Sequence, residues 1–140
     1  MSEQWIATRL LLDRDGRRVE VAIGVPYDDG RNWYCPYRVD RAGEVTIKKR
    51  AGGVDGLQAL ALASEALSQL LEQSGETLTW HVLENGVPVA VGETGDTGIY
   101  RLLPAALGFP FYKKMRQLVE DEVAQLADEL VRRRLQRDPL

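Results

Sequence analysis

The sequence predicts an α+β fold, with an antiparallel sheet of four to five strands covered by one buried helix, and a long amphipathic C-terminal helix. Short runs that alternate in polarity and are separated by turn signals fill residues 1–50, which is typical of antiparallel strands. A strong helix start then opens an apolar segment, and a second helical pattern follows near the end. The length of 140 residues predicts one domain over 1–140, whose last few residues fray.

The first fifty residues are predicted to form four strands joined by turns. Residues 5–12 and 18–25 form a hairpin, because a turn signal separates them and the second run alternates between polar and apolar residues. Residues 33–39 form a third strand, in which Pro36 indicates an edge position or a bulge. Residues 44–50 form the fourth, and the short connections predict an antiparallel meander.

The clearest local signal is the helix start Gly52-Gly53-Val54-Asp55-Gly56-Leu57-Gln58. Asp55 is predicted to be the N-cap, because its carboxylate can accept N–H groups of the first turn, and Gln58 completes a capping box. Leucine and alanine fill most of the circumference as far as Gln73, which predicts a central, buried helix. A phosphate cradle at this N-terminus is the alternative, but no P-loop or GxGxxG pattern supports it.

Two strand-like segments and one helix follow this buried helix in the sequence. Residues 77–82 could continue the sheet, and residues 87–91, after an Asn-Gly turn signal, could add a short edge strand. Residues 92–98 are the most loop-like segment of the chain. A long amphipathic helix is expected to begin at Phe111 or Tyr112. Its apolar side packs on the sheet or against a second copy of the chain.

Charge divides the chain into three parts. Residues 1–50 carry ten Lys/Arg and eight Asp/Glu. Residues 51–111 carry one basic and seven acidic residues, and residues 112–140 carry seven basic and six acidic residues. The acidic middle argues against a nucleic-acid binder with a basic face and favours an acidic surface that meets a basic partner. No apolar run approaches the ~20 residues that span a membrane. The absence of a signal-like core and the single cysteine predict a cytoplasmic protein.

The chain offers few groups for catalysis or metal binding. One cysteine and one histidine, Cys35 and His81, are too few for a zinc site and would form a catalytic pair only on neighbouring strands. The four serines lack the GxSxG setting of a nucleophile. Glu93 and Asp96 are candidates for a hard-metal site, but their spacing matches no EF-hand. We therefore expect no enzyme activity, no cofactor and no metal.

The expected function is binding of a protein partner. Exposed Trp and Tyr are typical interface anchors, although core packing of the same rings is the alternative. The candidate contact residues are Trp33, Tyr34, Tyr37, Glu84, Glu93 and Asp96. A non-catalytic cytoplasmic module of this kind fits an immunity protein that neutralises a basic bacterial toxin. A subunit that forms homodimers through its C-terminal helix is the alternative, and a small-ligand-binding protein or enzyme is a third.

Three motifs resemble a family of small bacterial proteins that is known only as a domain of unknown function. The motifs are the strand pattern Trp33-x-Cys35-x-Tyr37, the helix start of residues 53–60 and the late Gly108-Phe109-Pro110. The resemblance covers about residues 5–111 and leaves the long final helix outside it. It implies no activity, no cofactor and no catalytic residue.

Overall fold

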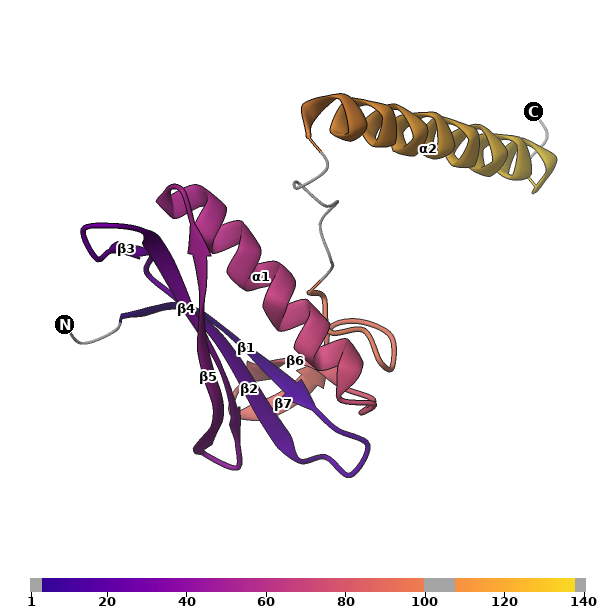
Figure 1. Ribbon diagram of the computed structural model, residues 1–140. Helices are drawn as coiled ribbons and strands as arrows, with labels where there is room; N and C mark the ends of the chain where they lie inside the picture. The colour runs from indigo at the N-terminus through magenta and orange to yellow at the C-terminus, as the bar shows by residue number, and fades with distance from the viewer. Residues whose placement is uncertain (1–3, 100–107, 138–140) are drawn as a thin grey trace. The chain divides into compact units, whose positions relative to one another are not determined.

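The computed structural model describes residues 4–99 and 108–137. Contacts group the chain into two compact units, Met1–Leu102 and Leu103–Leu140. The single domain over 1–140 stays a prediction, and the fraying expected of residues 138–140 lies outside the described residues. The described part of the first unit is a sheet with one helix packed on it, and that of the second is one long helix (Figure 1).

Seven strands form a single antiparallel sheet in the first unit. They are β1 (Trp5–Leu12), β2 (Arg18–Gly24), β3 (Tyr27–Asp28), β4 (Trp33–Arg41), β5 (Glu44–Gly53), β6 (Thr79–Glu84) and β7 (Val87–Ala90). Across the sheet, β5 pairs β4, and β4 is followed by β2, β1, β6 and β7. The short β3 pairs the beginning of β4, beyond the end of β2 on the same side.

The α+β class is confirmed, but the sheet has seven strands rather than four or five. Strands β1, β2, β4 and β5 form the predicted meander, in which each pairs antiparallel with the next. The additional strands have two explanations. Strand β3 has two residues, which are too few to show an alternating pattern. Strand β6 pairs with β1 and β7 pairs with β6, so both strands of this hairpin belong to the sheet.

Pro36 lies inside a central strand, at neither of the two positions that the sequence predicts. Strand β4 pairs β5 along its length on one side, and on the other side it pairs β2 from Tyr37 onward and β3 up to Tyr34. Pro36 falls in the interruption between β2 and β3, where a missing N–H removes no ladder hydrogen bond on that side. Gly24 leaves room for the proline ring, because an added Cβ would lie 2.5 Å from Pro36 Cγ.

Helix α1 (Gly56–Gln73) begins where the sequence predicts. Asp55 is the N-cap, and its Oδ1 accepts the N–H of Gln58 at 2.8 Å. Gln58 Oε1 accepts the N–H of Val54 at 2.7 Å, one residue before the N–H used in a capping box. Asp55 is thus the N-cap, whereas Gln58 bonds the residue before it, and this bond links α1 to the residue that follows β5.

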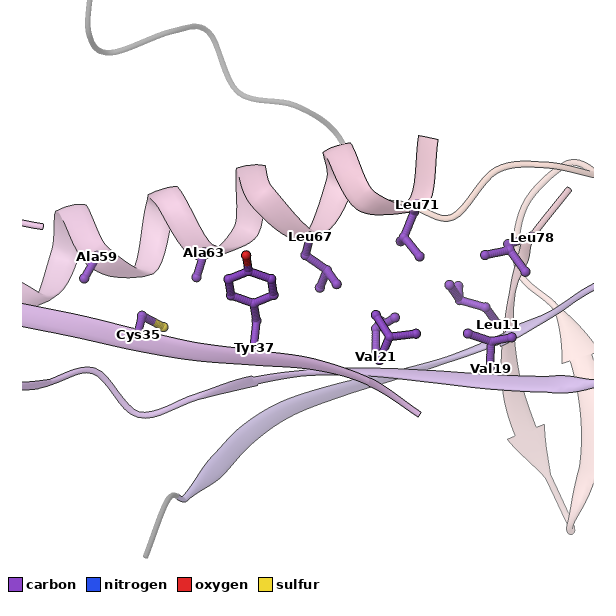
Figure 2. Packing of buried hydrophobic residues seen from close by; sticks show 11 residues of the cluster. Leu11, Val19, Val21, Cys35, Tyr37, Ala59, Ala63, Leu67, Leu71 and Leu78 are labelled. Atoms are coloured by element: carbon purple, nitrogen blue, oxygen red, sulfur yellow. The ribbon is translucent and has the colours of Figure 1, made fainter. Parts of the chain in front are cut away.

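The core lies between α1 and one face of the sheet (Figure 2). Helix α1 contacts β4, β5 and β2. Its buried residues form a single stripe: Ala59, Ala63, Leu67, Ser68 and Leu71. The two alanines lie over Cys35 and Tyr37, and the leucines face the apolar residues of β1 and β2. The sequence predicts burial on most sides of this helix, whereas Leu57 on another side is 77% exposed.

Helix α2 (Phe109–Arg137) is the described helix of the second unit. It begins two residues before the predicted Phe111. Pro110 is compatible with this earlier start, because an N–H in the first turn has no partner within the helix. The N–H of Tyr112 donates to the carbonyl oxygen of Gly108 at 3.1 Å, so the Gly-Phe-Pro motif lies at the helix start.

Candidate functional site

The three predicted aromatic contact residues lie in different surroundings along β4. Trp33 is half-buried and packs against the core. Tyr34 is half-buried on the opposite face, with its ring 3.8 Å from the guanidinium carbon of Arg50. Tyr37 is 6% exposed, and its side chain points toward α1 (Figure 2). Tyr37 is thus a core residue whose ring a partner cannot reach, because alternation along the strand turns it under the helix.

The three predicted acidic contact residues lie beyond β1, on the other side of the sheet centre. Glu84 ends β6 and Glu93 follows β7, and both are exposed. Asp96 is half-buried; its carbonyl oxygen accepts the N–H of Trp80 and its Oδ1 accepts the N–H of Gly98, both at 2.8 Å. Strands β2 and β1 separate β4 from β6, so the structure does not bring the aromatic and acidic candidates together.

Cys35 and His81 do not form a catalytic pair, because β2 and β1 lie between their strands. The Cys35 thiol is fully buried and donates to the carbonyl oxygen of Gly24 at 3.4 Å. Burial raises the pKa of this thiol from 9.0 to about 11. His81 uses Nδ1 to hydrogen bond the carbonyl oxygen of Thr79 at 2.8 Å. Cys35 therefore lacks the thiolate character that a nucleophile needs at neutral pH.

Cys35 is expected to resist a thiol reagent such as DTNB in the folded chain. At pH 8 its labelling should be about 100-fold slower than in the urea-unfolded chain, because the raised pKa reduces the thiolate fraction and burial limits access. The raised pKa stabilises the fold below pH 9, and this contribution is lost as the pH rises toward about 11. Equal labelling rates in both states would contradict the buried position.

Two guanidinium–aromatic contacts lie on the sheet face opposite α1. The guanidinium carbon of Arg38 lies 4.4 Å from the centre of the Trp5 ring. Arg50 contacts Tyr34 and also donates a hydrogen bond to Tyr27 Oη at 3.1 Å. The alternation of side chains along β4 is a sequence signal that places Tyr34 and Arg38 on the same face. The sequence gives no such signal for Trp5, because a register shift at the start of β1 changes the pairing of this residue.

A cavity of about 260 Å³ opens on the α1 side of the sheet. Most of its lining is apolar and comes from β1, β2, α1 and the segment after β7: Ala7, Val21, Ile23, Leu67 and Ile99. The hydroxyl-bearing Ser64 of α1 lines it as well. Among the described residues that line the cavity, Arg9 of β1 is the charged one. An apolar hollow with a few polar groups is the usual form of a small-ligand site.

Two contacts hold Arg9 beside this cavity. Its guanidinium carbon lies 3.8 Å from the centre of the Trp80 ring, and its Nη1 donates to the carbonyl oxygen of Thr97 at 3.2 Å. Gly98 makes this arrangement possible, with φ at +68° and no side chain. An added Cβ would lie 2.5 Å from Trp80 Cε3 and 2.8 Å from Arg9 Nη1. The segment predicted to be a loop is thus fitted closely against β1 and β6.

Helix α2 carries an apolar stripe along one side, in which most successive residues are three or four positions apart. The stripe consists of Leu118, Val119, Val123, Leu126 and Leu130, which are 51–64% exposed. None of the described residues of α2 is buried. Polar pairs one turn apart occur elsewhere on the helix, where Arg116 Nε lies 2.9 Å from Glu120 Oε1. Taken by itself, the helix therefore has a charged side and an apolar side.

The part of the chain that the structure describes shows neither a metal-binding cluster nor a membrane-crossing helix. Within residues 4–99 and 108–137, no group of three or more His, Cys, Asp or Glu side chains is placed to hold a metal ion. Asp96, a hard-metal candidate from the sequence, instead uses a carboxylate oxygen to accept the N–H of Gly98. Neither α1 nor α2 combines the length and apolarity that a membrane-crossing helix needs.

Comparison with known proteins identifies a family. A family model described as a domain of unknown function, DUF6968, matches residues 7–91, which is more than half of the 140 residues. The match runs from β1 to just beyond β7 and includes α1, whereas Gly108-Phe109-Pro110 and α2 lie outside it. No curated protein and no solved structure matches the chain. The resemblance to a family of unknown function is confirmed, and the chain belongs to the DUF6968 family.

Proposed function

We propose that this chain is a non-catalytic protein-binding module that contacts its partner through the apolar stripe of α2. The observation that carries the proposal is the exposure of this stripe, whose five side chains are 51–64% accessible. Contiguous apolar residues on a protein surface are typical of interaction sites. An amphipathic helix that inserts its apolar side into a groove is also a recurrent mode of recognition.

The place of α2 outside the family match supports the same proposal. The matched residues 7–91 contain the complete seven-stranded sheet, apart from the first residues of β1, together with α1. Their buried core forms between the sheet and α1 without a described residue of α2. Helix α2 is thus an addition to a unit that already has its own core, which suits a binding element.

More specifically, we propose that the chain is an immunity protein that neutralises a basic toxin in the cytoplasm. Charge supports it, because Glu84 and Glu93 are exposed and α1 contains glutamates but no lysine or arginine. An acidic surface steers a basic partner toward the complex and increases its association rate. The buried thiol of Cys35, which is free of any disulfide, suits a reducing compartment.

The proposal is tested by affinity capture from a lysate of the host, followed by mass spectrometry, with two variants beside the wild-type chain. Leu126→Glu places a charge in the middle of the apolar stripe. Ala124→Glu adds the same charge about 200° around the helix. Both side chains are exposed, so both variants should keep the wild-type free energy of unfolding. Leu126→Glu should recover about tenfold less partner, whereas Ala124→Glu should recover as much as wild type.

Equal recovery by Leu126→Glu and by the wild-type chain would contradict binding through α2. A third variant, with Glu84→Lys and Glu93→Lys, tests the acidic surface separately. Loss of the partner from this variant, and not from Leu126→Glu, would move the contact to the first unit. Retention of the partner by the charge-reversed variant would remove the acidic surface from the proposal.

Self-association through α2 is a second candidate, favoured by the charge order along the helix. Residues 120–122 are all acidic and residues 132–134 are all arginine. In an antiparallel pair of helices, the acidic block of one copy can lie opposite the basic block of the other. Sedimentation over a range of concentrations decides between the candidates. A dimer that Leu126→Glu converts to a monomer would support self-association, and a concentration-independent wild-type monomer would contradict it.

A further inference from the structure

We propose that the cavity beside Arg9 binds a small monocarboxylic acid with an apolar body, whose carboxylate pairs with the Arg9 guanidinium. This site lies in the first unit, so the inference is independent of the protein-binding role given to α2. It assigns a ligand class to a region of the family domain, since Arg9 and the other described lining residues up to Leu67 lie within residues 7–91.

The charge of the cavity selects an anion. Arg9 is the charged residue among the described residues that line it. Its guanidinium carries five N–H donors, and one of its nitrogens donates to the carbonyl oxygen of Thr97. Within residues 4–99 and 108–137, no carboxylate forms an ion pair with Arg9. Stacking on Trp80 fixes the guanidinium plane, which leaves donors for a planar carboxylate in a bidentate arrangement.

The walls select the rest of the ligand. Apolar side chains of the sheet and of Leu67 surround most of the cavity, and Ser64 supplies a hydroxyl. The volume of about 260 Å³ lies below the range of about 300–1,000 Å³ for drug-sized ligands, so a small acid with a single ring or a short branched chain fits. A free phosphate fits less well, because its higher charge would lie against apolar walls beside one arginine.

Hydrogen bonds hold the wall of the cavity in place. Ser68 is fully buried, and its Oγ donates to the carbonyl oxygen of Ile99 at 3.1 Å. Asp96 fixes the preceding turn, because its Oδ1 accepts the N–H of Gly98 and its carbonyl oxygen accepts the N–H of Trp80. These bonds tie the segment after β7 to both α1 and β6. A preformed site reduces the ordering that binding would otherwise require.

The test is a calorimetric titration of the full chain with sodium benzoate, sodium isovalerate and sodium octanoate, with benzamide as a neutral control. Saturable binding of at least one acid, about tenfold tighter than that of benzamide to the same chain, is expected. Two-dimensional NMR should place the bound acid, with shifts at the Trp80 indole and the Ile99 amide. Absence of saturable binding by all three acids would overturn the proposal, as would equal binding of benzoate and benzamide.

Three variants locate the site. Arg9→Gln should weaken binding of the acid about tenfold or more, whereas Arg18→Gln, which removes an exposed positive charge from the same sheet, should leave it within about twofold. Ser64→Leu fills the cavity, leaves Arg9 in place and should also abolish binding. If Arg9→Gln does not fold, the Ser64→Leu variant alone tests whether the acid binds in this cavity. Wild-type affinity in a folded Arg9→Gln chain, or in Ser64→Leu, would overturn the proposal.

Discussion

Replacing Leu67 by alanine is expected to lower the free energy of unfolding by about 3 kcal/mol, within the ~2–5 kcal/mol typical of a buried leucine. Leu67 is 1% exposed and points from the middle of α1 toward the sheet (Figure 2). Its removal deletes apolar contacts and leaves a void that the neighbouring side chains fill only in part. Urea denaturation followed by circular dichroism measures the change.

Leu57→Ala is the matched control, because it makes the same exchange on the same helix. Leu57 is 77% exposed, so the change in the free energy of unfolding should stay below about 0.5 kcal/mol. A similar loss for both variants would mean that α1 presents a different side to the sheet. The difference between the two therefore tests the orientation of the helix on which the core depends.

Gly53→Ala is expected to lower the free energy of unfolding by about 2 kcal/mol, within the ~1–3 kcal/mol typical of overpacking. An added Cβ would lie 2.6 Å from the backbone nitrogen of Ala59 and 3.0 Å from its Cα. Both atoms belong to the first turns of α1, so the helix backbone must move to admit the methyl group. The free energy of unfolding, measured as for Leu67→Ala, gives the effect.

Gly52→Ala provides the comparison for Gly53, because both glycines end β5 and neither has a positive φ. At Gly52 the nearest atom to an added Cβ is Tyr34 Cε1 at 3.5 Å, which is ordinary contact. This variant should change the free energy of unfolding by less than about 1 kcal/mol, with either sign. Equal and small effects at both positions would contradict the close approach of α1 to β5.

Local signals account for the parts of the fold that the sequence predicts well. Strand β1 has the predicted bounds, and Asp55 and Gln58 cap α1, because alternation and capping depend on residues close in sequence. The pairing of β6 with β1 could not be predicted, since Leu11 and Trp80 meet only in the folded sheet. Pro36 predicts an edge strand, but β4 is a central strand. The proline is tolerated there because it lies in the gap between the β2 and β3 pairings of β4.

The candidate site was harder to predict for the same reason. Alternation shows that Tyr34 and Tyr37 face opposite sides, but it does not show which side α1 covers. Arg9 had no local feature to distinguish it from the other arginines. Its contact with Thr97 joins residues 88 positions apart, and it also depends on the bare backbone of Gly98. Only the assembled sheet reveals the cavity that they share.

Amide hydrogen exchange of the chain, alone and with its captured partner, tests the central claim that α2 is the binding element. We expect the amides of residues 118–130 to exchange more slowly in the complex, because docking of the apolar stripe suppresses opening of the helix. The amides of β1 and β2 should change little. Unchanged exchange in α2, with new protection confined to the first unit, would contradict the account.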